Sequence, residues 1–283
     1  SIRTVQKRKG MSPKCFPTSA QVRSMTFWRF LISSALLLPA ALSSVRKRKI
    51  HLSGKNILAF SCQGVLCVCL SMVALQLAVF QAKSAAMIAV IFSTNSVLSV
   101  LLAAVLLKEP MTLRKVLAVV LCMAGVVMGS VSGEHESLSA IALALCAAAS
   151  MSLFTVLGKK LMKGIPPEVQ IGVSFPIGAA VLALFLLIAR VPLLPTSWDV
   201  QTLGIIGVLG IVVTGLGYWS YFKAMECSGA SMAAMVFFIK PIFAPVASMI
   251  FLGNVTLDAT FYLSLSLVTI GSSLLLWHRK QRT

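Results

Sequence analysis

The residues of this sequence best suited to chemistry are charged and amide side chains inside long apolar stretches. Lys240-Pro241 lies near the middle of residues 231–258, a run long and apolar enough to cross a bilayer. A lysine at that depth costs about 2.5–3.5 kcal/mol on insertion scales, so it should face the protein interior or a wet cavity. Pro241 removes a backbone donor and tends to kink a helix, as expected where helices open around a substrate. The alternative is a lysine that neutralises a helix end or packs in a polar seam.

Other polar side chains also lie within apolar stretches. Arg29 is near the start of one, so it either reaches outward to the membrane surface or faces the protein interior. Gln76, Gln63 and Gln170 are intramembrane amides, and a hydrogen bond between helices is the favoured interpretation of each.

Residue sets typical of catalysis or metal binding are missing from the sequence. No Asp or Glu lies at the centre of an apolar span, and His51, His135 and His278 lie at or outside the span edges. Paired carboxylates, a Ser-His-Asp set, metal-ligand spacings and an ATP-binding loop are all lacking. The seven cysteines are interpreted as small hydrophobic residues. We therefore expect no enzyme, metal or cofactor, and transport driven only by a secondary mechanism.

The composition predicts the elements that position these residues. Of 283 residues, 58% are hydrophobic and 11% charged, with a mean hydropathy of +0.94, which excludes a soluble globular domain. A net charge of +18 would suggest nucleic acid in a soluble protein, but here the cations lie in short loops. The sequence predicts an all-α transmembrane bundle of about nine helices, over 25–44, 56–80, 84–107, 112–130, 137–158, 169–189, 200–224, 230–252 and 256–277.

Cationic loops alternate with neutral or acidic ones. RKRK at 46–49 is one cationic cluster, and Arg279, Lys280 and Arg282 form the last, whereas Glu134-His135-Glu136 lies in an intervening loop. This pattern predicts a cytoplasmic C-terminus. With nine helices the basic residues of segment 1–24 would lie outside, against the same rule, and the consistent inner loops outweigh them.

An internal repeat accounts for the odd number of spans. KGIPP at 163–167 matches KGMSP at 9–13, and VLLKEPMTL at 105–113 resembles MIFLGNVTL at 249–257. We expect a ten-helix, five-plus-five inverted repeat that lacks its first helix here. The predicted units are a basic N-terminal segment at 1–24, a first repeat at 25–130, a second at 137–277 and a cytoplasmic tail at 278–283.

Alignment of the repeats on Glu109 and Asn254 is a shift of 145 positions. It places Asn95 opposite Lys240 and Ser96 opposite Pro241. Related by the internal twofold, Asn95 and Lys240 would meet at the cavity centre and could hold a carboxylate or another anionic group. The alternative for Asn95 is a hydrogen bond to a neighbouring helix, worth roughly 1 kcal/mol.

Aromatic and glycine patterns have simpler interpretations. Tyr218, Trp219 and Tyr221 lie near one end of the span 200–224, which favours aromatic anchors at the membrane surface over a wall of a substrate site. The three-residue spacing of Gly204, Gly207 and Gly210 predicts close helix packing, as does Gly125 with Gly129.

The sequence resembles the EamA-type members of the drug/metabolite transporter superfamily across 9–277. The resemblance lies in residues 25–42, in LLKEPMTLRKVLAVVLCMAGVVMGS at 106–130, and in residues 214–254. It implies ten helices, both termini in the cytoplasm, a central cavity and transport of small metabolites, often outward. It also implies that Gln76, in the family's third helix, flanks this cavity. The family often has a proline in its fourth helix where this chain has Asn95-Ser96. Its Gly-Glu helix ending appears here as Lys108-Glu109 and Gly253-Asn254.

These observations predict a secondary transporter, an exporter of an amino acid or a related anionic or zwitterionic metabolite, working by alternating access. The alternative is a truncated, non-transporting membrane protein of the same fold. We expect a bacterial inner-membrane protein whose partners are a small-molecule substrate and lipid, with a homodimer left open and no nucleic acid. The predicted substrate-binding residues are Lys240, Asn95, Ser96, Arg29, Gln76 and Pro241.

Overall fold

A computed structural model shows a helical chain. It describes residues 19–50, 53–83, 85–131, 137–161, 165–194 and 200–228, with residues 262, 263, 266, 267, 269–271 and 274, and none of these forms a β-strand. The elements are α2 (Ser19–Arg48), α3 (Gly54–Gly64), η2 (Val65–Met72), α4 (Val73–Gln81), α5 (Ala85–Phe92), α6 (Thr94–Leu106), α7 (Leu113–Val131), α8 (Leu138–Leu161), α9 (Pro167–Ile188), α10 (Val200–Val208), η3 (Leu209–Leu216) and α11 (Gly217–Ser228).

Six helical stretches are long and apolar enough to cross a membrane. They are Ser24–Arg48, Gly54–Gln81, Met87–Leu106, Leu138–Leu161, Pro167–Ile188 and Thr202–Cys227. The protein is therefore an all-α transmembrane bundle, as predicted. The predicted span at 112–130 corresponds to α7. The predicted span 230–252 and most of 256–277 lie outside the described residues.

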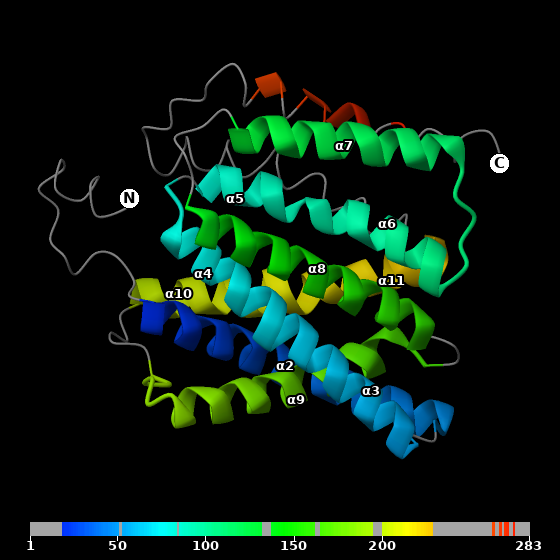
Figure 1. The fold of residues 1–283 in the computed structure, drawn as a ribbon. Helices are drawn as coiled ribbons and strands as arrows, with labels where there is room; N and C mark the ends of the chain where they lie inside the picture. Colours follow the sequence, from blue (N-terminus) through cyan, green and yellow to red (C-terminus); the bar gives the residue numbers. More distant parts are fainter. Residues whose placement is uncertain are drawn as a thin grey trace, which may run out of the picture.

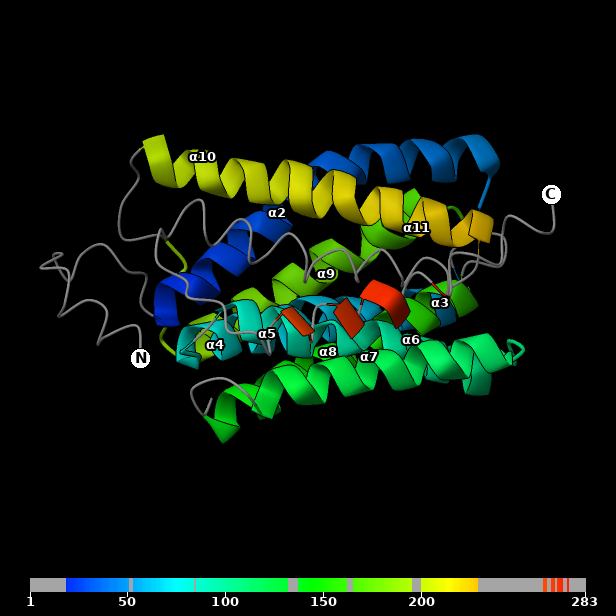
Figure 2. The ribbon, with the colours of Figure 1, turned by 90° about the horizontal axis from the view of Figure 1, so that it is seen from above.

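Successive membrane helices run in opposite directions. In Figure 1, α2, α5–α6, α8 and α10–α11 run from left to right, and α3–α4, α7 and α9 run back. Figure 2, the view from above, shows the same alternation. Because connections between neighbouring spans are short, each helix turns back after one crossing.

The charged ends of these helices gather on one side of the bundle, on the right in Figure 1. The C-terminal end of α2 carries Arg46, Lys47 and Arg48, and that of α8 carries Lys159 and Lys160. Lys223 lies toward the same side on α11. We call this side the cationic end. Lys83 and Arg190 lie at the opposite end.

Helices α2 and α9 cross at the centre and carry the core. Phe30 of α2 and Phe175 of α9 are both fully buried, with ring centroids 5.1 Å apart in an edge-to-face contact. A Cβ atom built on Gly172 of α9 would lie 2.5 Å from Ala41 Cβ and 3.1 Å from the Leu37 carbonyl oxygen of α2, so alanine in place of this glycine would push the two helices apart. Gly64 of α3 packs backbone-to-backbone against α9 in the same way.

Two kinds of irregularity interrupt the predicted helices. The span 84–107 is divided at Ser93, where α5 ends and α6 begins. The spans 56–80 and 200–224 each contain a π-helical segment of 8 residues, η2 and η3. Such segments widen a helix locally and occur most often at functional sites.

Candidate functional site

Arg29 lies between helices rather than at the lipid surface. Its Nε donates a hydrogen bond of 3.1 Å to Thr214 Oγ1 of η3, and its Nη2 lies 3.7 Å from Met72 Sδ of η2. Its Cζ atom is 5.1 Å from the centroid of the Phe30 ring. Within the described residues the ion pairs, Lys115–Glu109 and Lys223–Glu226, do not involve it. The guanidinium therefore has neutral partners there, which leave several of its five N–H donors for an anion.

Gln76 lies in the same helix interface as Arg29. Thr26, one turn before Arg29 on α2, donates a hydrogen bond to Gln76 Oε1. Gln76 in turn follows Met72, the contact of Arg29, by four residues. The structure thus brings together two of the predicted site residues, Arg29 and Gln76, between α2 and the helix formed by η2 and α4.

Tyr218 of α11 is the centre of an aromatic and sulfur cluster beside Arg29. Its ring packs edge-to-face on Phe175 and Phe154, with centroids 5.2 and 5.9 Å away. Its hydroxyl lies 3.6 Å from Cys67 Sγ, 4.0 Å from Met72 Sδ and 3.9 Å from Met151 Sδ.

The prediction that Tyr218 and Tyr221 anchor the chain at the membrane surface is wrong. Their exposed fractions are 8% and 7%, against 40% for Trp219. The Tyr221 hydroxyl donates to Thr155 Oγ1 of α8 at 3.1 Å. Both rings face the bundle because α11 lies against α8 and α9, and a buried phenol finds a polar partner there.

Asn95 and Ser96 lie at a different interface, between α6 and α8. Both are buried, with exposed fractions of 1% and 0%. Ser152 Oγ of α8 donates to the Asn95 carbonyl oxygen at 2.7 Å, and Ser96 Oγ to Asn95 Oδ1 at 3.2 Å. Lys240 and Pro241, their predicted counterparts, lie outside the described residues, so the predicted meeting of Asn95 with Lys240 remains a prediction.

A buried amide network joins α3, α8 and α9 toward the cationic end. Gln170 Nε2 donates to Gln63 Oε1 at 2.9 Å and to the Gly158 carbonyl at 3.1 Å. Gln63 Nε2 donates to the Phe154 carbonyl at 3.2 Å, and Ser174 Oγ donates to the Gln170 carbonyl at 2.7 Å. The predicted helix-to-helix hydrogen bonds of Gln63 and Gln170 are confirmed.

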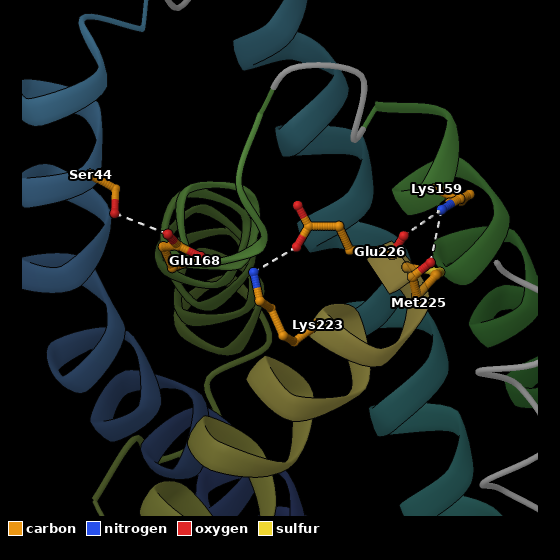
Figure 3. A network of polar contacts seen from close by, with 6 residues as sticks. All are labelled: Ser44, Lys159, Glu168, Lys223, Met225 and Glu226. Carbon is orange, nitrogen blue, oxygen red and sulfur yellow. Dashed lines mark hydrogen bonds and ion pairs between the residues drawn. The ribbon is translucent and has the colours of Figure 1, made fainter. Parts of the chain in front are cut away.

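A second polar network lies at the cationic end itself (Figure 3). Lys159 Nζ of α8 donates to the carbonyl oxygens of Met225 and Glu226, at 2.8 and 3.4 Å, in the last turn of α11. Lys223 pairs with the Glu226 carboxylate at 2.8 Å. A cation among the last carbonyls of a helix satisfies acceptors that have no partner within the helix.

Ser44 and Glu168 connect α2 with α9 in the same layer. Ser44 Oγ donates to Glu168 Oε1 at 3.0 Å (Figure 3). The Ser44–Glu168 contact therefore joins α2 to α9, and the Lys159 contacts join α8 to α11, at the cationic end.

The close-packing prediction holds for one glycine of three in the 204–210 pattern. A Cβ atom on Gly210 would meet Ile32 Cβ of α2 at 2.9 Å, whereas one on Gly204 or Gly207 would meet no atom within 4 Å among the described residues. The pattern misled because this helix packs against α2 mainly through η3, which begins at Leu209, and much less through α10.

Equivalent features recur at a nearly constant separation. The π-helical segments η2 and η3 begin at Val65 and Leu209, 144 positions apart. Phe30 and Phe175, 145 positions apart, are in contact at the crossing of α2 and α9. Helices α2 and α9, the equivalent pair, run in opposite directions (Figure 1).

A bundle with several helices long and apolar enough to cross a membrane, with a guanidinium and amides between them, is that of a multi-pass integral membrane protein. The chain belongs to the EamA-like transporter family, which matches residues 11–131 and 138–277. It is 30% identical over 251 residues to an uncharacterized transporter of Clostridium kluyveri, covering 86% of this chain and 79% of that protein. It is 23% identical over 231 residues to the uncharacterized transporter YyaM of Bacillus subtilis, covering 80% and 75%.

The fold is also that of a protein of known crystal structure. The TM-score is 0.69, and the match covers 100% of this chain and 94% of that one. At 17% sequence identity the likeness concerns the fold alone.

Thr214, Met72 and Tyr218, the neighbours of Arg29, were not predicted as site residues. Thr214 and Met72 have no distinctive spacing in the sequence, and Tyr218 carries the aromatic signature of an interfacial anchor. One signal could have identified Thr214: it is a hydroxyl residue at the centre of the apolar stretch 202–227. An intramembrane Arg needs a polar partner, and such a hydroxyl can provide one.

Proposed function

We propose that this membrane transporter is a secondary exporter of a small polar metabolite, an amino acid or a related anionic or zwitterionic compound. The observation that carries the proposal is the environment of Arg29. A cation within a membrane bundle normally pairs with an acid, a backbone carbonyl or a ligand. Among the described residues the hydrogen-bonding partners of Arg29 are a hydroxyl and a thioether.

An anionic group is the chemistry that Arg29 lacks. The planar guanidinium suits a carboxylate, which accepts two parallel hydrogen bonds. Lys240, which the predicted repeat would bring opposite Asn95, would add a second cation near the bilayer centre. Gln76 next to Arg29 would offer an amide to the polar remainder of the substrate. Membership of a transporter family with this set of groups favours a carrier over an enzyme.

The proposed mechanism is alternating access between two inverted halves. Its support is the near-constant separation of equivalent features, the opposite direction of α2 and α9, and a family match in two segments. Inverted repeats of this type generate two openings by rocking one half against the other around a central site. The contacts of Ser44 and Lys159 would then have to break when the cationic end opens.

The cationic end is assigned to the cytoplasm of a bacterial cell, with the C-terminus on the same side. Lys and Arg favour cytoplasmic loops, and most of the described cations gather at this end. An impermeant thiol reagent applied to intact cells should leave Arg48→Cys unlabelled and label Lys83→Cys. Strong labelling at position 48 would reverse the orientation.

Transport can be tested before the substrate is identified. The medium of cells that produce the protein is compared by mass spectrometry with that of cells producing Arg29→Met at the same level. A metabolite enriched outside wild-type cells is then tested for flux in reconstituted vesicles. We expect Arg29→Met to reduce the flux at least about tenfold, since a hydrogen bond to a charged group contributes about 1.5–3 kcal/mol. Equal flux in wild type and Arg29→Met would exclude the guanidinium as a substrate ligand.

A further inference from the structure

The division between α5 and α6 concentrates hydroxyl groups in the middle of a membrane span. Ser93 Oγ donates to the Val90 carbonyl at 2.6 Å, and Thr94 Oγ1 donates to the Ile91 carbonyl at 2.7 Å. Side chains that bond back to the preceding turn in this way bend helices. The N-terminus of α6 has no side-chain cap. The bend therefore places the next residue, Asn95, at the start of a half-helix inside the bundle.

The Asn95 amide has an unused donor. Its Oδ1 accepts from Ser96, and its backbone carbonyl accepts from Ser152, but its Nδ2 is buried without a hydrogen-bond partner among the described residues. The side chain is 1% exposed. A buried amide nitrogen without an acceptor is costly, and natural proteins keep few such groups.

The charges around Asn95 favour an anionic acceptor over a cation. Among the described elements, α6 and the helices with which it has most contacts, α5, α7 and α8, contain no Asp or Glu. An amide N–H cannot ligate a cation, and there is no carboxylate on these helices to repel an anion.

Asn95 is separate from Arg29 but connected to it through α8. Met151 contacts the Tyr218 hydroxyl at 3.9 Å, on the side of Arg29, and the next residue, Ser152, donates to Asn95. Successive residues of a helix point about 100° apart. The Tyr218 hydroxyl and Asn95 therefore lie beside neighbouring faces of α8, the first at Met151 and the second at Ser152.

We propose that Asn95 forms a second subsite that binds a carboxylate oxygen through Nδ2, independently of Arg29. The proposal deepens the proposed function, because it assigns the transported compounds to the carboxylates. It differs from that function in its test, since binding to the Asn95 subsite needs no gradient and no transport cycle.

Acetate is the probe, and the purified full chain in detergent is the sample. The melting temperature is followed as acetate replaces chloride at constant ionic strength, with acetamide as the neutral isostere. A ligand that binds only the folded state raises the melting temperature in a saturable way. The titration is repeated in Arg29→Met, which removes the other anion site, and in Arg29→Met with Asn95→Leu.

We expect Arg29→Met to retain saturable acetate binding, and the added Asn95→Leu to weaken it at least about tenfold. Ser99→Ala, which alters another buried residue of α6, is the matched control and should leave acetate binding unchanged. Melting temperatures without acetate and gel filtration verify that each variant is folded, and Asn95→Asp serves as the second variant if Asn95→Leu does not fold.

Acetate binding that disappears in Arg29→Met, or that survives Asn95→Leu, would overturn the subsite. An equal response to acetamide would overturn the assignment to carboxylates. Flux that fails in vesicles while acetate binding depends on Asn95 would reject the proposed transport function and leave the subsite standing.

Discussion

Two interfaces that the predicted repeat relates to each other differ in the chemistry of their side chains. At the α2–η3 interface Gly210 approaches the Arg29 carbonyl, and at the α3–α9 interface Gly64 approaches the Ser174 carbonyl. Arg29 and Ser174 are 145 positions apart. The backbone packing is thus repeated, but one interface holds a guanidinium with a hydroxyl and a thioether, and the other a network of neutral amides.

The difference suggests different roles: the α3–α9 interface stabilises the bundle, and the α2–η3 interface is suited to binding a substrate. The α3–α9 interface satisfies most of its polar groups internally, and its backbones are in direct contact. At the α2–η3 interface, Arg29 keeps N–H donors available, and Gly210 faces the Ile32 side chain as well as the Arg29 carbonyl. We infer that the same backbone packing can form a rigid helix–helix contact in one half of the chain and a ligand site in the other.

The largest effect should come from Gly64→Ala. The added Cβ would lie 2.2 Å from the Ser174 carbonyl oxygen and 2.9 Å from the Gly178 nitrogen, both backbone atoms, so α3 and α9 must separate. Overpacking of this kind costs about 1–3 kcal/mol or more. The folded fraction after gel filtration and a denaturation curve measure the loss.

Gly210→Ala changes the close-packed glycine of the other interface, 146 positions after Gly64, and should be milder. Its closest contacts are 2.9 Å to Cβ and Cγ2 of Ile32 and 3.2 Å to the Arg29 carbonyl, so the overlap is smaller than that of Gly64, whose added Cβ would lie 2.2 Å from a backbone oxygen. Gly204→Ala, whose added Cβ has no neighbour within 4 Å among the described residues, is the neutral control. Equal losses for Gly64→Ala and Gly210→Ala would remove the proposed difference in rigidity.

Gln63→Leu should reduce stability while leaving transport by the folded protein intact. The change leaves the Phe154 carbonyl without its donor and removes an acceptor of Gln170, which costs about 1–3 kcal/mol. Stability is measured by denaturation, and flux is expressed per folded molecule. A flux loss as large as that of Arg29→Met would mean that the α3–α9 interface is also part of the substrate path.

How much of this contrast the sequence predicts depends on the residue. An apolar stretch with one amide is a good predictor of a hydrogen bond between helices, and Gln63 and Gln170 confirm it. The sequence leaves Arg29 undecided between lipid surface and interior, because its distance from the helix start allows both. The outcome depends on Thr214, which is distant in sequence and becomes a neighbour only through the packing of α2 against η3.

The two π-helical segments could not be predicted from the sequence. Residues 65–72 and 209–216 are largely apolar runs, with glycine only in the second and no proline in either, so nothing in them distinguishes a π-helix from an α-helix. The division at Ser93 had a signal in the consecutive residues Ser93, Thr94, Asn95 and Ser96. Only the last two belong to the predicted site, and the hydroxyls before them were overlooked, although such side chains compete for backbone carbonyls.

The smallest effect is expected at Thr214, which sharpens the comparison within the α2–η3 interface. Thr214→Val removes the acceptor of Arg29 Nε while keeping the shape of the side chain. The loss of this hydrogen bond should loosen the orientation of the guanidinium and raise the KM for transport roughly fivefold, equivalent to about 1 kcal/mol, with a small fall in the melting temperature. Thr214→Ser should restore the wild-type KM, and failure of serine to do so would assign Thr214 a packing role instead.

The π-helical segment η2 also makes the chain sensitive to length. Gln63 precedes η2 and bonds to α9, and Gln76 follows it and bonds to α2, so the segment sets the angle between these two faces. A π-helical turn holds more residues than an α-helical one, so removing one residue from 65–72 would let the segment become α-helical. The distance between Gln63 and Gln76 along the helix would then be shorter by about 1.5 Å, the rise of one α-helical residue. The length of η2 therefore sets the spacing of the two amides, and the identity of Met72 sets the contact with Arg29.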